Sequence, residues 1–389
     1  MSRVAAIDCG TNSIRLLIAD VDGKNFREVV REMRIVRLGE GVDKTGSFSQ
    51  EAIERTLAAV AEYAQIMASK GVEDIRFCAT SATRDAKNRM VFINGVKELI
   101  GVEPEVIPGE EEAALSFNGA VADLAGQYPG PYLVVDIGGG STEFVYGTAE
   151  VEKAKSVNIG CVRMRERHLN TQPPTPTQIQ KAVEDIDREI AVAAKTVPLK
   201  EAKTLIAVAG TATTVAAASL EFNSYDRYSI HGALVPSFKV IEISQRFSLS
   251  SQEQISALPY MHEGRVDVIT AGALVLSRVM IATGATHFVA SETDILDGIA
   301  RSIPELKIKR AQEEQERIER EAEAEKVRAE QDAREAEEQK KREEEESADA
   351  QKRRQDEIEA IAASYIAAED EEEKEDSDFY RSLMENEEE

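Results

Sequence analysis

Residue types that build disulfides and metal centres are scarce in this chain. Its 389 residues include three cysteines and four histidines. No two cysteines have the CxxC spacing of a zinc or redox motif, which argues against a disulfide framework and a zinc ribbon. The three thiols are expected to be reduced and buried, and the scattered histidines have no metal-ligand spacing.

Long apolar segments are also missing. No run of about 18 apolar residues occurs, and the N-terminal stretch MSRVAAIDCG enters a predicted strand at once. We therefore expect neither a membrane span nor a signal peptide, and a cytoplasmic location. Hydrophobic residues still make up 42% of the chain, which is enough for sizeable cores, and the length predicts two or three domains.

Positive charge falls short of negative charge, mostly in the C-terminal part. The net charge is −25, and residues 306–389 hold 32 acidic but only 16 basic residues. The rest of the chain is moderately acidic. An acidic surface repels polyanions, so we expect no nucleic-acid partner and no membrane partner.

What is present is a pattern of apolar strands that end in aspartate and glycine. The stretch YLVVDIGGGSTEFVYG, residues 132–147, has the pattern strand, turn, strand. Its glycines, Gly138, Gly139 and Gly140, allow positive φ and leave no Cβ in the way, so backbone N–H groups can converge on an anion. The tip of this hairpin is therefore a candidate phosphate site.

An earlier segment has the same design. The stretch VAAIDCGTNSIRLLIADV, residues 4–21, runs from an apolar strand through Asp8 and Gly10 into a second apolar strand. A fold with two similar halves would place both hairpin tips, with Asp8 and Asp136, on either side of one cleft. A third signal is AVAGTATT, residues 207–214, a glycine turn between a buried strand and a helix, as is common beneath a nucleotide or phosphate.

The order of elements predicts an α/β protein of two lobes. Residues 1–125 contain consecutive strands followed by alternating helices and strands, and residues 126–305 repeat this order in outline, with the last helix returning to lobe I as an alternative. In lobe I, one predicted helix begins at the N-cap Ser49 and stops at Gly71. A second, over residues 81–101, is predicted to be continuous.

The tail begins with a highly charged segment. Residues 306–352 are almost wholly Glu, Arg, Lys, Ala and Gln, which predicts a single charged helix supported by i,i+4 ion pairs. These pairs are Glu313/Arg317, Glu316/Arg320, Glu330/Arg334, Glu337/Lys341 and Glu338/Arg342. A coiled coil is the alternative, but the aliphatic residues Ile318 and Val327 follow no heptad.

The end of the tail has a different composition. Within residues 353–389, a short amphipathic helix is predicted, with Ile358, Ile361, Tyr365 and Ile366 on one face. The acidic residues after it are predicted to be disordered. The amphipathic helix is a candidate docking element for another protein.

Acidic residues near the glycine turns suit phosphate chemistry. Asp8 and Asp136 are suited to bind a divalent cation or to orient a water molecule. Residues 110–112 are three consecutive glutamates at a helix start; complementarity to the helix dipole accounts for one or two of them. One glutamate is therefore a candidate general base that activates water, and Glu143 is expected to face the cleft.

Five motifs in order resemble one known family. The motifs are AIDCGTNSIRL, CATSATRDAKN, VIPGEEEAAL, VVDIGGGSTEF and AVAGTATT, and together they resemble the exopolyphosphatase/guanosine pentaphosphate phosphohydrolase family of the actin-like ATPase superfamily. The resemblance covers about residues 3–300 and implies a two-lobed actin-like (ribonuclease H-like) α/β fold with a central cleft. The chain resembles short two-domain members, common in actinobacteria, because it lacks the helical C-terminal domain of the long ones.

The resemblance also assigns roles to residues. The general base falls on Glu112, and the metal-binding and water-orienting carboxylates fall on Asp8, Asp136 and Glu143. The implied substrate-binding residues are Gly10, Thr11, Asn12, Ser13, Arg84, Gly138, Gly139, Gly140, Ser141 and Thr142, to which the third turn adds Gly210 and Thr211. One departure is Asp297, which stands where the family usually has a basic residue.

The sequence therefore predicts a Mg²⁺-dependent hydrolase, with Mn²⁺ as the alternative cation, that removes the terminal phosphate of inorganic polyphosphate. Short chains are expected because the acidic tail repels long polyanions. Guanosine pentaphosphate is the alternative substrate, since it needs the same phosphate clamp, and would make the protein a stringent-response enzyme. A non-catalytic phosphate- or nucleotide-sensing protein is the alternative of another class. A homodimer and the role of the tail stay open.

Overall fold

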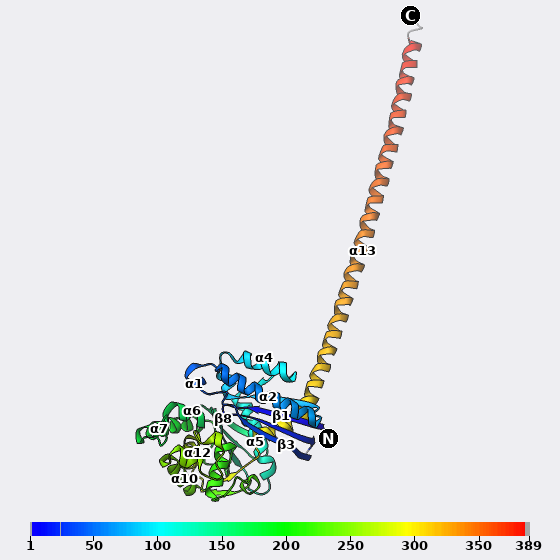
Figure 1. Ribbon diagram of the computed structural model, residues 1–389. Helices are drawn as coiled ribbons and strands as arrows, with labels where there is room; N and C mark the ends of the chain where they lie inside the picture. The colour runs from blue at the N-terminus through cyan, green and yellow to red at the C-terminus, as the bar shows by residue number, and fades with distance from the viewer. Residues whose placement is uncertain (1, 24, 386–389) are drawn as a thin grey trace. The chain divides into compact units, whose positions relative to one another are not determined.

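The chain forms two units in the computed structural model, Met1–Ile308, which holds both lobes, and Lys309–Glu389 (Figure 1). The structure describes residues 2–23 and 25–385. In this part of the chain no helix combines the length and the apolarity that crossing a bilayer requires. The three cysteines are buried and form no disulfide, as predicted.

The first lobe is built on a five-stranded sheet with the order β3-β2-β1-β4-β5. Its strands are β1 (Ser2–Cys9), β2 (Ser13–Asp22), β3 (Asn25–Ile35), β4 (Asp74–Ala79) and β5 (Glu105–Val106). The first three strands are antiparallel neighbours, whereas β4 and β5 run parallel to β1. The helices of this part are α1 (Val42–Thr45), α2 (Gln50–Lys70), α3 (Ser81–Asp85), α4 (Arg89–Ile100) and α5 (Gly109–Leu124).

The second lobe repeats this topology in a six-stranded sheet, β10-β11-β9-β6-β7-β8. Its strands are β6 (Tyr132–Ile137), β7 (Thr142–Gly147), β8 (Val151–Val157), β9 (Thr204–Val208), β10 (Leu234–Pro236) and β11 (His287–Ala290). The order β8-β7-β6-β9-β11 matches β3-β2-β1-β4-β5, with the same antiparallel and parallel neighbours. The predicted two-lobed actin-like fold is therefore confirmed.

Helices cover the second sheet and complete the lobe. They are α6 (Cys161–His168), α7 (Pro176–Ala193), α8 (Ala209–Ser219), α9 (Arg227–Ile230), α10 (Ser237–Leu249), α11 (Gln252–Ser256), the 3₁₀ turn η1 (Glu263–Arg265) and α12 (Ile269–Thr283). The core of this lobe lies between its sheet and the helices α7, α8, α10 and α12.

Local sequence signals set several helix ends. The Ser49 side chain accepts a hydrogen bond from the Ala52 N–H at the start of α2, and Gly71 ends the helix in the left-handed conformation, as predicted. The predicted helix over residues 81–101 is wrong in one respect, because it breaks between α3 and α4. Asn88 pairs with both backbone groups of Phe48, and this tertiary contact fixes the break.

The two lobes are joined by the crossing of α5 with the start of α13 (Ile295–Glu385). Leu115 of α5 and the first turns of α13 pack against β1 and β2, whereas the opposite face of α5 packs against β6 and β7. The helices touch at two glycines. A Cβ at Gly119 would lie 1.8 Å from the Asp294 carbonyl oxygen, and one at Gly298 would lie 2.0 Å from the Leu115 carbonyl oxygen.

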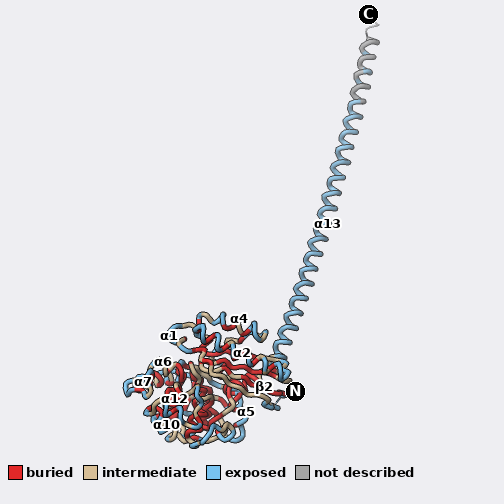
Figure 2. Tube along the Cα trace, in the orientation of Figure 1, coloured by how far each residue is buried: buried red, intermediate tan, exposed pale blue. Residues whose placement is uncertain are grey.

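The second unit is a helix whose described backbone continues to Glu385. Its described side chains are exposed (Figure 2), so local interactions must support it. Of the five predicted i,i+4 pairs, Glu337/Lys341 is formed at 3.1 Å and Glu316/Arg320 at 4.0 Å. The structure differs from the predicted disorder after the amphipathic helix, because the helix has no break there; residues 386–389 lie outside the described residues.

Replacing Gly119 tests the crossing of α5 and α13. Because a Cβ there would meet backbone atoms that cannot turn aside, Gly119→Ala should lower the free energy of unfolding by about 1–3 kcal/mol. Gly95→Ala is the matched control, because its Cβ would meet only the end of the Leu57 side chain. Chemical denaturation measures both. Equal effects of the two substitutions would contradict a tight crossing.

Candidate active site

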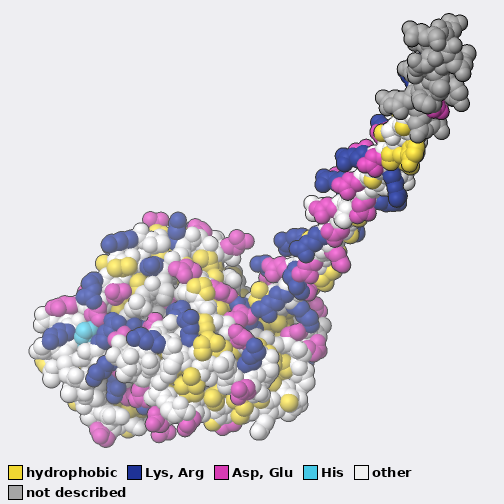
Figure 3. Space-filling model, turned by 90° about the horizontal axis from the view of Figure 1, so that it is seen from above, with side chains coloured by type: hydrophobic (Ala, Val, Ile, Leu, Met, Phe, Trp, Pro, Cys, Tyr) yellow, Lys and Arg dark blue, Asp and Glu magenta, His cyan; other side chains and the backbone are white. Residues whose placement is uncertain are grey.

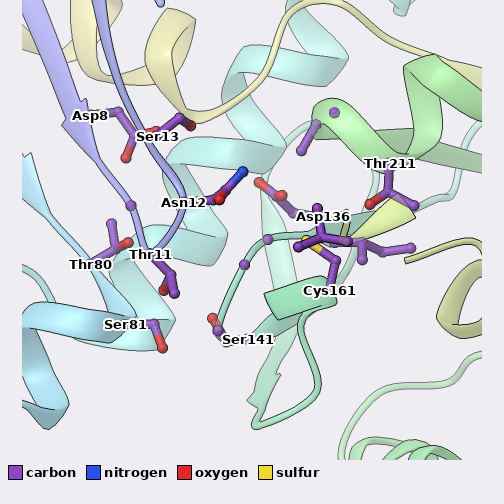
Figure 4. Close-up of a pocket in the computed structure, with 18 of the residues that line it drawn as sticks. Asp8, Thr11, Asn12, Ser13, Thr80, Ser81, Asp136, Ser141, Cys161 and Thr211 are labelled. Carbon is purple, nitrogen blue, oxygen red and sulfur yellow. The ribbon is translucent and has the colours of Figure 1, made fainter. Parts of the chain in front are cut away.

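A cavity of about 100 Å³ lies between the tips of the two hairpins. Figure 4 shows Thr11, Asn12, Thr80 and Ser81 of the first lobe on one side and Ser141, Cys161 and Thr211 of the second lobe on the other. The first turn of α5 and Arg265 also line it. The predicted facing arrangement of the hairpins is therefore present.

The two hairpins have the same backbone design but carry different charges. Asp8 pairs across β1 and β2 with Arg15, and Asp136 pairs across β6 and β7 with Glu143. The guanidinium of Arg15 donates two hydrogen bonds to Asp8 Oδ2, at 3.0 Å from Nε and 2.7 Å from Nη2. Arg15 also pairs with Asp294. Asp8 is thus paired with its cross-strand neighbour, a cation that it shares with Asp294, whereas Asp136 faces another acid.

Three buried carboxyl groups lie close enough to interact. Burial raises the pKa of Asp136 to about 7, and Asp294 and Glu112 add repulsion. Burial also raises the pKa of Glu143 well above its usual value, and repulsion from Glu112 and Asp136 adds to it. The pKa of Glu112 is raised by burial as well, against the attraction of Arg84. This end of the cleft therefore carries more buried acid than its cations neutralise.

Each of these carboxyl groups is oriented by a hydrogen bond. The Ser116 hydroxyl donates to Asp136 Oδ2 at 2.7 Å, and the Ser156 hydroxyl donates to Glu143 Oε1 at 2.7 Å. Arg84 Nη1 donates to Glu112 Oε2 at 2.7 Å and to the Ile107 carbonyl oxygen at 2.9 Å. Glu112 is therefore held on α5 by an arginine from the end of α3.

The glycines of the second hairpin allow a close approach of the two lobes. A Cβ at Gly139 would lie 2.8 Å from the Thr11 Cβ, and one at Gly140 would lie 2.6 Å from the Ser81 hydroxyl. None of the glycines at residues 138–140 has a positive φ, so the conformational freedom of glycine is not used there. Space is what these positions require, because side chains would push the hairpin tips apart.

Unsatisfied polar atoms point to a ligand between the hairpins. Thr11 Oγ1 and Asn12 Oδ1 are buried without a hydrogen-bond partner. Buried polar atoms of this kind are uncommon in proteins and are usually explained by a ligand or by bound water. The Thr11 hydroxyl, with those of Ser81 and Ser141, can donate to the oxygens of a small anion such as phosphate, whereas Asn12 Oδ1 can only accept a hydrogen bond, as from bound water.

The third predicted turn also reaches the cavity. Gly210 and Thr211 line it at the start of α8, after Ala209, which has φ 66°. A Cβ at Gly210 would lie 2.4 Å from the Arg265 Cζ, so glycine lets the guanidinium lie on the backbone. Arg265 Nη1 donates to the Gly210 carbonyl oxygen and to Thr214 Oγ1, both at 3.0 Å.

The structure brings most of the predicted site residues together. Those that line the cavity are Asp8, Gly10, Thr11, Asn12, Ser13, Glu112, Asp136, Gly138, Gly139, Gly140, Ser141, Gly210 and Thr211. Glu143, Arg84 and Thr142 do not line it. Thr142 instead donates its hydroxyl to the Ile159 carbonyl oxygen, and the Arg84 contact is with Glu112.

Sequence reasoning missed other lining residues. Arg15, Thr80, Ser81 and Arg265 belong to the wall. Arg15 had a signal, because a charged residue inside the apolar stretch SIRLLIAD needs a buried partner. Thr80 and Ser81 stand beside the predicted Arg84, but nothing local in the sequence marks Arg265.

The unusual acid at residue 297 has a structural role. Asp294 Oδ1 accepts a hydrogen bond from the Leu296 N–H, and Asp297 Oδ2 accepts one from the Asp294 N–H, both at 3.0 Å. These reciprocal bonds cap the start of α13. Asp297 also pairs with Arg31 at 2.5 Å. Asp297 therefore fixes the start of α13. The cap of that helix, Asp294, in turn pairs with Arg15.

A cation at the site would need few protein ligands. Within residues 2–23 and 25–385, no group of three or more His, Cys, Asp or Glu side chains is arranged to hold a metal ion, and Asp8 is engaged by Arg15. Mg²⁺, however, is usually bound by one or two carboxylates, with water and phosphate oxygens completing its shell. The facing pair Asp136 and Glu143 fits that requirement.

Comparison with known proteins identifies relatives of this chain. The chain matches the profile of the Ppx/GppA phosphatase family over residues 17–303. It is 46% identical over 316 residues to Exopolyphosphatase 2 of Mycobacterium tuberculosis, covering 78% of this chain and 99% of the relative. It is also 34% identical over 312 residues to a bifunctional 3-dehydroquinate synthase/phosphatase of Fusobacterium nucleatum, covering 76% of this chain and 45% of that protein.

Solved structures agree with these matches. The crystal structure of an exopolyphosphatase-like protein is 45% identical with a TM-score of 0.76, covering 77% of this chain and 97% of that one. The Ppx/GppA family member of Aquifex aeolicus is 29% identical with a TM-score of 0.66, covering 77% of this chain and 97% of that one.

The raised pKa of Asp136 predicts a pH-dependent cost to stability. Because the folded pKa is about 7 and the ordinary value is 3.8, this cost is absent below about pH 4, grows as the pH rises, and is complete above about pH 7. In protein treated with EDTA, Asp136→Asn should raise the free energy of unfolding at pH 8 by up to about 4 kcal/mol. At pH 4 the difference should vanish.

An acid with the opposite shift provides the control. Hydrogen bonds from Arg3 and Arg27 lower the pKa of Asp20, so Asp20→Asn should destabilise the protein at neutral pH, with a smaller effect as the pH falls. Chemical denaturation across pH 4–8 measures both variants. If Asp136→Asn instead lowered the free energy of unfolding at pH 8, the ionised Asp136 carboxylate would not destabilise the folded protein, and the prediction would be wrong.

Proposed function

The chain belongs to the Ppx/GppA phosphatase family and is a phosphoanhydride hydrolase, and from this premise we propose that it is an exopolyphosphatase that releases the terminal phosphate of inorganic polyphosphate. The observation that carries the proposal is that buried Glu112 lines the small cavity between the two hairpin tips. A base and an anion cradle in one cavity are what hydrolysis of a terminal phosphate requires.

Glu112 is the proposed general base. Its carboxylate lies in the wall of the cavity, and Arg84 holds it in one orientation. Burial raises its pKa, which brings a carboxylate closer to the basicity needed to accept a proton from water near neutral pH. In the proposed step, Glu112 takes one proton from the attacking water while the hydroxyls and backbone of both hairpins hold the phosphate in line.

Asp136 and Glu143 are the proposed cation ligands. Their facing carboxyls are buried with few cations nearby, and a divalent ion would relieve the repulsion between them. Mg²⁺, or Mn²⁺ as the alternative, would supply charge neutralisation for the phosphate oxygens at this point. Asp8 has a different task in this proposal, because its salt bridge fixes Arg15 in the wall of the cavity.

Guanosine pentaphosphate is the second candidate substrate, and one feature favours it. A larger cavity of about 590 Å³ adjoins the first and shares five lining residues with it, Arg15, Met33, Ala209, Gly210 and Arg265. Tyr225, Pro259, Tyr260 and Met261 supply apolar walls. Such a cavity has room for the nucleoside part of a substrate whose terminal phosphate lies between the hairpins.

Phosphate release from three substrates tests the proposal: short polyphosphate, long polyphosphate and guanosine pentaphosphate, each with Mg²⁺. Fast release from polyphosphate is expected, with a preference for short chains because the acidic tail repels long ones. Release from the nucleotide alone would favour the second candidate. No release from any of the three would favour a phosphate- or nucleotide-sensing protein without catalysis.

Glu112→Gln should lower kcat on the preferred substrate by about 10²–10⁴-fold, because the amide cannot accept the proton. Glu110→Gln is the matched control, since Glu110 is the exposed glutamate two residues earlier on the same helix. Steady-state phosphate release measures both. Equal activities of Glu112→Gln and the wild type would remove Glu112 as the base.

Substituting Arg84 separates two roles for this residue. Arg84 pairs with Glu112 at 2.7 Å; in the proposed positioning role, Arg84→Met should lower kcat by about tenfold or more and change KM little. The resemblance implied a contact with substrate phosphate, for which KM should rise. The pH profile is a further readout, because the Arg84 guanidinium opposes the rise in the pKa of Glu112. Without Arg84 the pKa of Glu112 should rise further, so the pH at which activity first appears on the acid side of the profile should move to higher pH.

A further inference from the structure

One arginine of α6 makes hydrogen bonds to both lobes. Arg163 Nε donates to the carbonyl oxygen of Gly140 in the second hairpin at 2.7 Å. Its Nη1 donates to Asp43 Oδ1 and its Nη2 to Asp85 Oδ2, each at 2.6 Å. These two acids belong to α1 and α3 of the first lobe. All three nitrogens of the guanidinium are therefore bound, each to a different segment of the chain.

The burial of this cation sets it apart from surface charges. Figure 3 shows acidic and basic side chains close to one another over the surface of the first unit. Ion pairs at the surface contribute little to stability, because water screens them. The Arg163 side chain is only 10% exposed and that of Asp43 is 20% exposed, whereas Asp85 is more open. The three contacts therefore hold the Arg163 side chain in one orientation.

The start of α6 also binds the backbone of the glycine-rich hairpin. The N–H groups of residues 161–163 donate to the carbonyl oxygens of Gly138 and Gly139 at 2.9–3.1 Å. The third carbonyl oxygen in this row, that of Gly140, is bound by the Arg163 side chain instead. Three successive carbonyl groups of the hairpin are therefore turned toward α6.

This pattern fixes the direction of the hairpin N–H groups. In a trans peptide the carbonyl group and the following N–H point in opposite directions, and both cis peptides of the described residues lie outside this hairpin. The N–H groups of Gly139, Gly140 and Ser141 therefore point away from α6. Within residues 2–23 and 25–385, none of the three donates to an acceptor. Residues 138–141 line the cavity, so these N–H groups suit the oxygens of an anion.

The first-lobe end of the contact lies on the helix that holds Glu112. Helix α3 carries Ser81, which lines the cavity, Arg84, which pairs with Glu112, and Asp85, which pairs with Arg163. Because α3 is only five residues long, a shift of Asp85 would shift Arg84 as well. Arg163 thus joins the hairpin of one lobe to the segment of the other lobe that holds the proposed base.

We propose that Arg163 is a positioning residue for hydrolysis: it holds the Gly140 peptide so that the Ser141 N–H points at an oxygen of the terminal phosphate. The proposal rests on the proposed function, in which that phosphate lies between the hairpins. Arg163 acts through the backbone, because it is not among the residues that line the cavity. Its bonds to Asp43 and Asp85 require the two lobes to be together, so the hairpin is held in this way only around a closed site.

Arg167 provides a matched control one turn later on α6. It also reaches the first lobe, because its Nε and Nη2 donate to the two carboxylate oxygens of Asp43 at 2.6 and 2.8 Å. Its other hydrogen bonds go to the Asn158 carbonyl oxygen and to Asp185, not to the hairpin. Joining the lobes is therefore common to both arginines, whereas holding the hairpin belongs to Arg163 alone.

Arg163→Lys and Arg167→Lys test the proposal, because lysine keeps the positive charge but lacks the planar fork. Calorimetry with inorganic phosphate should show that Arg163→Lys raises Kd about tenfold, the effect of one hydrogen bond to a charged group. On short polyphosphate with Mg²⁺, KM should rise about tenfold with little change in kcat, because the lost bond serves the ground state and the transition state alike. Arg167→Lys should leave Kd and KM unchanged, and chemical denaturation should show equal stabilities of the two variants.

Two kinds of failure can be told apart. Equal phosphate affinities of the two lysine variants, a fall in kcat at unchanged KM, or no phosphate binding by the wild type would overturn the positioning role of Arg163. Phosphate binding by the wild type without hydrolysis of any substrate would instead contradict the proposed function, and the Kd values would still decide the role of Arg163.

Guanidinium ion provides a second measurement with Arg163→Ala. At millimolar concentration it should restore part of the phosphate affinity, because it can bind in the space between the Gly140 carbonyl oxygen and the two acids. Ammonium ion at the same concentration is the control for charge and should restore less. Equal restoration by both ions, or none by guanidinium, would overturn the proposal.

Discussion

An excess of buried negative charge is the constraint on which the site depends. Asp136 and Glu143 face each other across one hairpin, and Glu112 interacts with both from α5. Buried charges without partners are costly, so the fold must hold these groups apart or supply protons and cations. Hydrogen bonds from Arg84, Ser116 and Ser156 hold the carboxyls in place, which suits them for the proposed proton transfer and cation binding.

The two hairpins illustrate how one backbone design can perform two tasks. Asp8 and Asp136 occupy equivalent positions, but their cross-strand neighbours are Arg15 and Glu143. Arginine turns the first hairpin into an ion-paired wall that extends through Asp294 to the start of α13. Glutamate turns the second into an acidic site. The difference in charge between the repeats therefore rests on one side chain in each.

The helical crossing links the site to the scaffold. α5 carries Glu112 in its first turn and touches α13 at Gly119 and Gly298. Ser116 on the same helix donates to Asp136. A change in the crossing would thus move Glu112 and the hydrogen bond to the acidic hairpin together. The second unit is stabilised differently, because its described side chains are exposed and ion pairs within the helix, rather than a hydrophobic core, support it.

Much of the fold and the site could be predicted from short-range patterns. Apolar runs before and after Asp8 and Asp136 predicted both hairpins, and Ser49 and Gly71 marked helix ends, because these features depend on neighbours in the chain. The contact of Arg84 with Glu112, the pairing of Asp8 with Arg15 and the position of Arg265 depend on residues that meet only after folding. The sequence by itself determined which chemical groups stand at the turns; the tertiary structure decided which of them face a ligand and which are neutralised, because burial and charge pairing act across space rather than along the chain.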